Sequence, residues 1–188
     1  MPLVCTILVN REHKLAPTYM PSCLTEVPIL FDAPSKDPKR LMALPAARAA
    51  GKLFSAAREQ GIFLYGISGY RSYERQKELY EERMKTGKPS YVNLYIAPPG
   101  ASEHQTGLAL DVSCPSVDLQ LEDRFSETKE GQWLSANAPL FGFVLRYPKG
   151  KEMITGYAWE PWHIRYVTKS LALYLTLTGL TLEEYHEQ

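Results

Sequence analysis

The chain has 188 residues, of which 45% are hydrophobic and 22% are charged, a composition typical of a globular protein with a buried core. Its 21 basic and 21 acidic residues cancel, and no run of lysines and arginines marks a surface for phosphates, so a nucleic-acid partner is not expected. No segment approaches the ~20 consecutive apolar residues that a transmembrane helix needs.

Cys5, Cys23 and Cys114 are odd in number and widely spaced. They predict neither a disulfide framework nor a thiolate zinc site, and we expect buried free thiols. The first residues, MPLVCTILVNREH, lack the basic start and the cleavage site of a signal peptide, and their apolar run predicts a strand. A cytoplasmic location follows, or the cell envelope if a leader or anchor has been removed.

Two features of the first third of the chain concern its architecture. Residues 20–40 are rich in proline and polar residues, which predicts an extended arm that wraps the core. A helix is predicted between Pro45, which suits a first helical turn, and Gly61, which suits a helix end. Its apolar stripe contains Leu53, Phe54 and Ala57.

The remaining pattern alternates short strands with helices. Strands are expected at 62–68, 108–112, 143–147 and 162–166, and helices at 73–87, 132–138, 167–177 and 180–188. This order favours an α+β fold with a small antiparallel sheet flanked by helices. We expect one domain over 1–188, in which 1–40 supply a strand and the wrapping arm.

The first candidate site lies in the segment from Ser102 to Asp111, which contains His104. Seven residues separate His104 and Asp111, so they are about 10 Å apart along a helix and on opposite faces of an unbroken strand. A turn at Gly107 brings them together, because it folds His104 back beside the following strand. Asp111 then faces away from the side that Leu108 packs into the core.

The second candidate site is the segment Glu160-Pro161-Trp162-His163. Pro161 excludes a helix interior and favours extended geometry at Glu160. We therefore expect His163 to project from a strand while Glu160 leans over it from the preceding bend.

Two histidines and one carboxylate from distant segments form the ligand set of a catalytic zinc site with an open position for water. In that chemistry Glu160 accepts the proton of the water and passes it to the leaving nitrogen of an amide. An exopeptidase must also bind the terminal carboxylate of its substrate, which suits an arginine fork. Arg71, on a turn between a predicted strand and helix, is the candidate.

Taken singly, each of these residues has another explanation. A lone His104 or His163 is usually structural, and Asp111 suits a cap at the end of a strand. Glu160 suits a salt bridge, and Arg71 suits an ion pair at a helix start. His13 and His186 lack a comparable setting and are expected at the surface.

The motifs S-x-H-x-x-G-x-A-x-D at Ser102 to Asp111 and E-x-W-H at Glu160 to His163 resemble those of the VanY-like zinc D-alanyl-D-alanine carboxypeptidases. The resemblance extends over nearly the whole chain. It implies one zinc ion bound by His104, Asp111 and His163, with Glu160 as catalytic base. It further implies that Arg71 stabilises oxygens of the substrate or transition state, and that Gln76 and Ser102 line the substrate pocket.

The same resemblance implies the substrates, which are peptidoglycan stem peptides or precursors that end in D-Ala. We expect hydrolysis of the D-Ala-D-Ala bond, with an L,D-carboxypeptidase that acts on tetrapeptide stems as the alternative. Residues 85–100 and the stretch after Cys114 are the candidate loops that set this preference. A zinc-stabilised cell-wall-binding module without turnover is the remaining hypothesis, and a monomer or weak dimer is expected.

Overall fold

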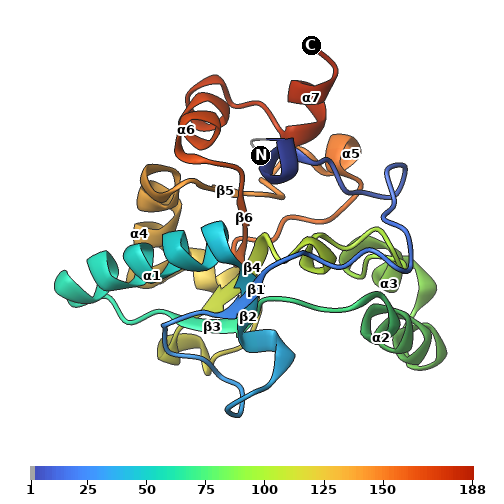
Figure 1. Cartoon of the computed structure of the whole chain (residues 1–188), viewed down its shortest axis with the longest axis horizontal. Coiled ribbons are helices and arrows are strands. Elements are labelled where there is room, and N and C mark those ends of the chain that lie inside the picture. Colours follow the sequence, from blue (N-terminus) through green and yellow to red (C-terminus); the bar gives the residue numbers. More distant parts are fainter. Residues whose placement is uncertain (1–2) are drawn as a thin grey trace.

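The computed structural model describes residues 3–188 and has the α+β fold that the sequence predicts. Its main sheet has four antiparallel strands in the order β3-β4-β6-β5 (Figure 1). A smaller antiparallel sheet pairs β1 with β2. The strands are β1 (Leu24–Glu26), β2 (Leu41–Ala43), β3 (Tyr65–Ser68), β4 (Ala109–Ser113), β5 (Phe143–Leu145) and β6 (His163–Tyr166).

Helices surround the main sheet, with α1 and α4 on the left of Figure 1, α2 and α3 on the right, and α5, α6 and α7 near the top. None of the helices within residues 3–188 is long and apolar enough to cross a bilayer. The helices are α1 (Leu44–Glu59), α2 (Tyr73–Thr86), α3 (Pro89–Tyr95), α4 (Lys129–Asn137), α5 (Glu152–Thr155), α6 (Lys169–Thr178) and α7 (Leu182–His186).

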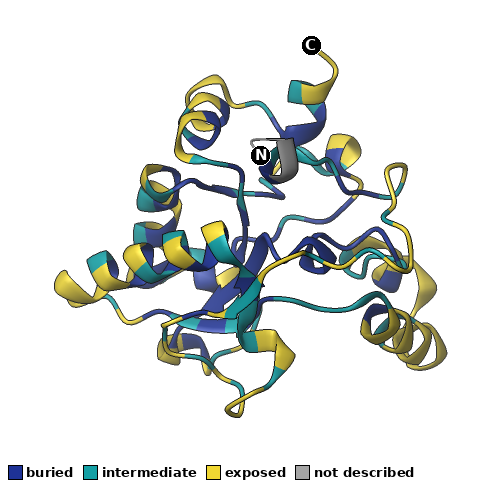
Figure 2. Ribbon diagram, in the orientation of Figure 1, coloured by how far each residue is buried: buried dark blue, intermediate teal, exposed yellow. Residues whose placement is uncertain are grey.

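Two hydrophobic clusters stabilise this arrangement. The larger one packs α1 against the main sheet and contains Leu53 of the helix with Leu110 and Ile164 of the central strands. The smaller one joins α6 and α7 to β5 through Leu175, Leu182 and Val144. The central strand β4 is accordingly buried along its whole length, whereas the outer sides of the helices are exposed (Figure 2).

The helices and strands predicted for residues 45–188 are confirmed, with shifts of a few residues at their ends. The first helix begins with a proline in its first turn and buries Leu53, Phe54 and Ala57, as its apolar stripe predicts. α2 begins at the N-cap Ser72, whose hydroxyl accepts a hydrogen bond from the backbone N–H of Arg75. Most of residues 20–40, the predicted arm, are irregular.

The strand predicted at the start of the chain is wrong over the described residues. Leu3–Thr6 form a 3₁₀ turn, and residues 7–13 are irregular. The reason is visible in the hydrogen bonds: the guanidinium of Arg165 donates from Nη2 to the carbonyls of Cys5 and Ile7, at 3.2 and 2.8 Å. These backbone acceptors are therefore satisfied by a side chain instead of a strand ladder.

Further differences are local, and among them the strand β2 and the short helix α5 were not predicted. The arm contains the short strand β1, and residues 85–100, expected as a loop, contain α3. Of the three thiols, Cys5 and Cys114 are buried as expected, but Cys23 is exposed because it lies on the arm just before β1. All three are free.

Candidate active site

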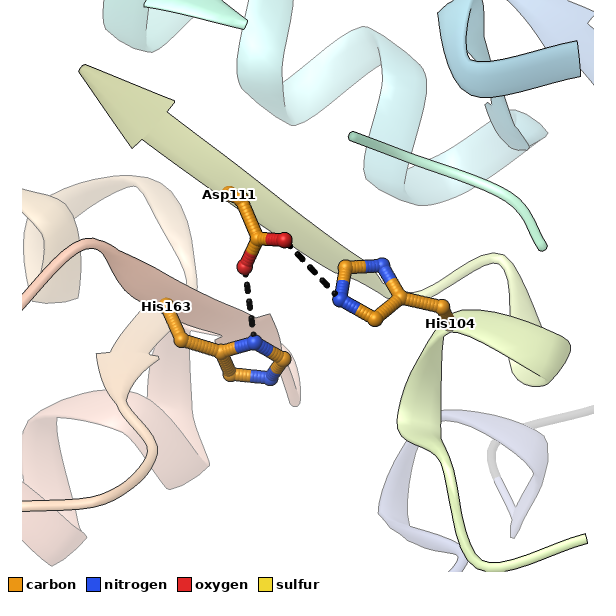
Figure 3. Close-up of side chains that lie close together, drawn as sticks. All are labelled: His104, Asp111 and His163. Carbon is orange, nitrogen blue, oxygen red and sulfur yellow. Dashed lines mark hydrogen bonds and ion pairs between the residues drawn. The ribbon is translucent and has the colours of Figure 1, made fainter. Parts of the chain in front are cut away.

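The site forms where β4 and β6 lie side by side. Asp111 of β4 and His163 of β6 are directly paired across this antiparallel ladder. His104 comes from a 3₁₀ turn, η3 (Glu103–Thr106), that immediately precedes β4. The three predicted metal ligands thus converge from three elements, as Figure 3 shows.

Asp111 lies between the two imidazole rings. Its Oδ2 atom is 3.2 Å from Nε2 of His104, and its Oδ1 atom is 2.9 Å from Nδ1 of His163 (Figure 3). One ligand atom from each residue lies within 4.8 Å of the others, and all three residues are buried. The spacing allows these three atoms to approach one ion with small side-chain movements.

The other nitrogen of each imidazole is bound to an acceptor. Nδ1 of His104 donates to the carbonyl of Gly69 at 2.7 Å, and Nε2 of His163 is 3.3 Å from a carboxylate oxygen of Glu103. In neutral rings these bonds keep the protons on the outer nitrogens and leave lone pairs on the nitrogens that face Asp111. Two such imidazoles and one carboxylate suit a catalytic zinc ion with a position left for water.

Burial and charge act differently on the three groups. Burial lowers the pKa of His104, which favours the neutral ring that a metal requires. Burial would raise the pKa of Asp111, but contacts with His104 and His163 outweigh it and hold that pKa well below its usual range. Burial also disfavours a charged His163, yet hydrogen bonds to Asp111 and Glu103 raise its pKa to about 9. A metal ion that binds here therefore displaces a proton from His163.

Gly107 provides the turn that the sequence predicts. Its φ of +67° ends η3 and starts the chain into β4, and its carbonyl accepts a hydrogen bond from the backbone N–H of Ala43. Leu108, directly before β4, packs into the core with Leu110 and Val112 of the strand, whereas Asp111 faces the cavity described below.

Gly107→Ala is expected to lower the free energy of unfolding by more than the ~1–2 kcal/mol cost of a left-handed alanine. A Cβ atom there would lie 2.9 Å from the backbone nitrogen of Ala43. Gly150→Ala is the matched control, because φ is +83° there and nothing lies within 4 Å of the added atom. Thermal denaturation compares the two, and an equal loss of stability would contradict the close approach at Gly107.

Glu160 lies directly before the turn that leads into β6, as predicted. Its carbonyl accepts the backbone N–H of His163, and its carboxylate is 3.9 Å from Nδ1 of His163. Burial raises the pKa of this carboxyl to about 8; His163 and Arg71 oppose the rise, whereas Asp111 adds to it. A carboxyl with a pKa near neutrality is suited to accept and return a proton at physiological pH.

Arg71 lies beyond the end of β3, and its backbone N–H donates a hydrogen bond to the carbonyl of His104. Its Nη1 donates to Oε1 of Gln76 at 2.9 Å, and its Nη2 donates to Oγ of Ser68 at 3.0 Å. Gln76 in turn donates to the carbonyl of Ala97, so both of its polar atoms are engaged. The structure therefore places Gln76 as a support for Arg71, whose guanidinium carries further N–H donors.

All seven residues predicted for the site line one cavity of about 790 Å³. Its inner end holds the metal ligands with Ser102, which is buried at the start of η3. Its outer walls come from α2, α3 and residues 121–124. Both segments expected to shape the pocket, 85–100 and the stretch after Cys114, thus contribute to its walls.

Sequence reasoning missed the buried groups behind the site. Oε1 of Glu103 accepts from Nε of Arg146 at 2.7 Å and from Nη1 of Arg165 at 2.6 Å. Arg146 also pairs with Glu183 of α7. The sequence offers one indication of these residues, their closeness to the predicted ligands: Glu103 adjoins His104, and Arg165 is two residues beyond His163.

Comparison with known proteins agrees with this geometry. Residues 39–169 match the model of the family VanY, D-alanyl-D-alanine carboxypeptidase. The chain is 42% identical over 181 residues to YodJ of Bacillus subtilis (strain 168), covering 96% of this chain and 66% of YodJ. It is 34% identical to the bifunctional D-Ala-D-Ala dipeptidase and carboxypeptidase VanXYC of Enterococcus gallinarum, covering 96% of this chain and 92% of VanXYC.

Solved structures show the same fold. The LdcB LD-carboxypeptidase superposes with a TM-score of 0.91 at 43% identity, over 96% of this chain and 84% of that one. A mutant of the vancomycin-resistance D,D-pentapeptidase VanY in complex with Zn(II) superposes with a TM-score of 0.78 at 32% identity, over 97% and 98% of the two chains. The chain therefore belongs to the VanY family of D-alanyl-D-alanine carboxypeptidases.

Proposed function

We propose that residues 1–188 form a single zinc carboxypeptidase domain that removes the C-terminal D-Ala from peptidoglycan stem peptides or their precursors, by cleaving the D-Ala-D-Ala bond. The observation that carries this proposal is the convergence of His104, Asp111 and His163 at the inner end of a cavity that also holds Glu160 and Arg71. The Zn(II) complex of the related D,D-pentapeptidase supports zinc as the metal.

The side chains divide the reaction between them. A zinc ion bound by the three ligands would supply a Lewis acid that polarises the scissile carbonyl and acidifies a water molecule. Glu160 accepts the proton of that water as a C–O bond forms, and delivers it to the nitrogen as the amide C–N bond breaks. Arg71 donates hydrogen bonds to substrate oxygens, from a position fixed by Ser68 and Gln76.

Arg71→Lys is expected to reduce kcat/KM by roughly 10- to 100-fold, because lysine keeps the charge but loses the planar fork that binds oxygens in pairs. Arg75→Lys is a matched control on the exposed face of the next helix, where Arg75 pairs with Glu78. Steady-state kinetics on a D-Ala-terminated peptide measures both variants. Equal activity of Arg71→Lys and the parent would remove Arg71 from the proposed substrate site.

The size of the cavity bears on the length of the substrate. A volume of about 790 Å³ lies in the upper part of the ~300–1,000 Å³ range of ligand pockets, so it accommodates a peptide of several residues. Residues 85–100 and 121–124 contact the part of the substrate that precedes the cleaved bond. The related VanXYC is named both a D-Ala-D-Ala dipeptidase and a D-Ala-D-Ala carboxypeptidase.

Cleavage of the L,D bond of tetrapeptide stems is the second candidate. It is favoured by the higher similarity to the LdcB LD-carboxypeptidase, with a TM-score of 0.91 against 0.78 for the D,D-pentapeptidase. Incubation of the zinc-loaded protein with D-Ala-D-Ala, a pentapeptide stem and a tetrapeptide stem, followed by mass spectrometry of the products, distinguishes the two.

We expect release of one D-Ala from the pentapeptide. Release from the tetrapeptide alone would assign the L,D reaction instead. Zinc binding with no product from any of the three would identify a binding module without turnover. The cytoplasmic location, with the cell envelope as its alternative, and the monomeric or weakly dimeric state stay predictions.

A further inference from the structure

Glu103 lies at the centre of a buried network that reaches the candidate metal centre. Its Oε1 atom accepts hydrogen bonds from Arg146 and Arg165 at 2.7 and 2.6 Å, and its Oε2 atom is 3.3 Å from Nε2 of His163. The side chain of Glu103 is fully buried. A carboxylate that bonds two guanidinium groups is an acceptor only, so the nitrogen of His163 that faces it must carry the proton.

Both arginines are themselves held in place. Arg146 makes two hydrogen bonds to the carboxylate of Glu183 on α7, at 2.8 and 2.6 Å. Arg165 donates to backbone carbonyls of the N-terminal segment. The two arginines that bond Glu103 are therefore held by partners of their own, and together they fix the position of the Glu103 carboxylate.

We propose that Glu103 is a positioning residue for the metal centre: by accepting the Nε2–H of His163, it fixes the tautomer and the ring orientation that present Nδ1 to the metal. This inference rests on the proposed zinc site. The 3₁₀ turn η3 then serves both histidines, because it carries His104 as one ligand and, one residue earlier, the group that orients the other ligand.

Glu103→Gln makes the proposal testable, since it replaces one carboxylate oxygen by an NH₂ group at nearly constant volume. The two arginines both require an acceptor, so the amide oxygen stays with them and the NH₂ group faces His163. Nε2 of His163 must then accept, and its proton moves to Nδ1, the nitrogen that should bind the metal. Loss of such an outer partner typically costs 10- to 100-fold in metal affinity.

Glu183→Gln is the matched control. It removes the same charge from the same buried network, but Glu183 contacts Arg146 and Asn10 and no metal ligand. We expect both variants to lower the melting temperature of the protein. Only Glu103→Gln should weaken zinc binding, by about 10- to 100-fold in competition with a chromophoric chelator. It should also shift the visible absorption bands of the Co(II)-substituted protein.

Equal zinc affinities of E103Q and E183Q would overturn the proposal and leave Glu103 with a structural role. If E103Q does not fold, E103D decides, because it keeps the charge for the arginines while a shorter side chain withdraws from His163. E103D with the zinc affinity of the parent would contradict the proposal, and a 10-fold or greater loss would support it. A parent protein that binds no zinc would instead refute the proposed function.

Discussion

Glu160→Gln is expected to retain one zinc ion per chain and to lose hydrolysis by at least about 100-fold, the usual scale for removal of a general base. The group of residues whose ligand atoms all lie within 4.8 Å of one another consists of His104, Asp111 and His163 and does not include Glu160. The carboxylate of Glu160 lies beside this group, 3.9 Å from Nδ1 of His163. The amide is of similar size but cannot accept the proton of water. Zinc content by atomic absorption and turnover of a D-Ala-terminated peptide give the two quantities.

Glu78→Gln is the control for this substitution, because Glu78 is exposed on α2 and pairs only with Arg75 among the described ion pairs. We expect it to match the parent in zinc content and turnover. A Glu160→Gln variant with full zinc and unchanged turnover would show that another group accepts the proton.

Asp111→Ala is expected to weaken zinc binding by more than about 100-fold, beyond the loss that an outer partner causes. Asp111 supplies the only carboxylate of the ligand set, and it is the group that both imidazoles face. At low zinc concentration the variant should therefore be inactive. Equilibrium zinc binding with a competing chelator measures the loss.

Asp111→Asn tests the same point with less change of shape, since it keeps an oxygen ligand but removes the charge. An intermediate affinity is expected for it. Asp32→Asn, at an exposed position outside the cavity, should bind zinc as the parent does. Unchanged zinc affinity in Asp111→Ala would place the metal elsewhere.

The parts of the site that the sequence predicts share a local cause. The His104 to Asp111 segment contains its own turn at Gly107, and alternation along β4 determines which side Asp111 faces. Pro161 likewise separates Glu160 from the strand that carries His163. The pairings of β4 with β6 and with β3 are long-range, and the chemistry of the ligand set anticipates the first of them.

The parts that the sequence does not predict depend on distant partners. Two of the short segments that were wrong or missed, at the N-terminus and at α3, are held by side chains far along the chain. Arg165 binds the carbonyls of residues 5 and 7, and Arg11 donates to the carbonyl of Asn93 in α3. Seven residues with two tyrosines and an asparagine have little helical propensity of their own, so α3 needs such contacts.

The charged network behind the site was missed for a related reason. Arginine and glutamate are almost always exposed unless they are paired, and the sequence does not reveal that Glu103 meets Arg146 and Arg165 from 43 and 62 residues away. These charges are buried because the tertiary fold brings the carboxylate and the two guanidinium groups together, so that each offsets the desolvation cost of the others. In the sequence alone, these glutamate and arginine residues look like ordinary solvent-exposed residues.

A crystal structure of the zinc-loaded protein, with data collected on both sides of the zinc absorption edge, tests the proposed metal site. We predict one anomalous peak, about 2.0–2.2 Å from Nε2 of His104, an oxygen of Asp111 and Nδ1 of His163, with a solvent molecule in the remaining position. A peak at another place, or a fourth protein side chain in the position of that solvent molecule, would contradict it.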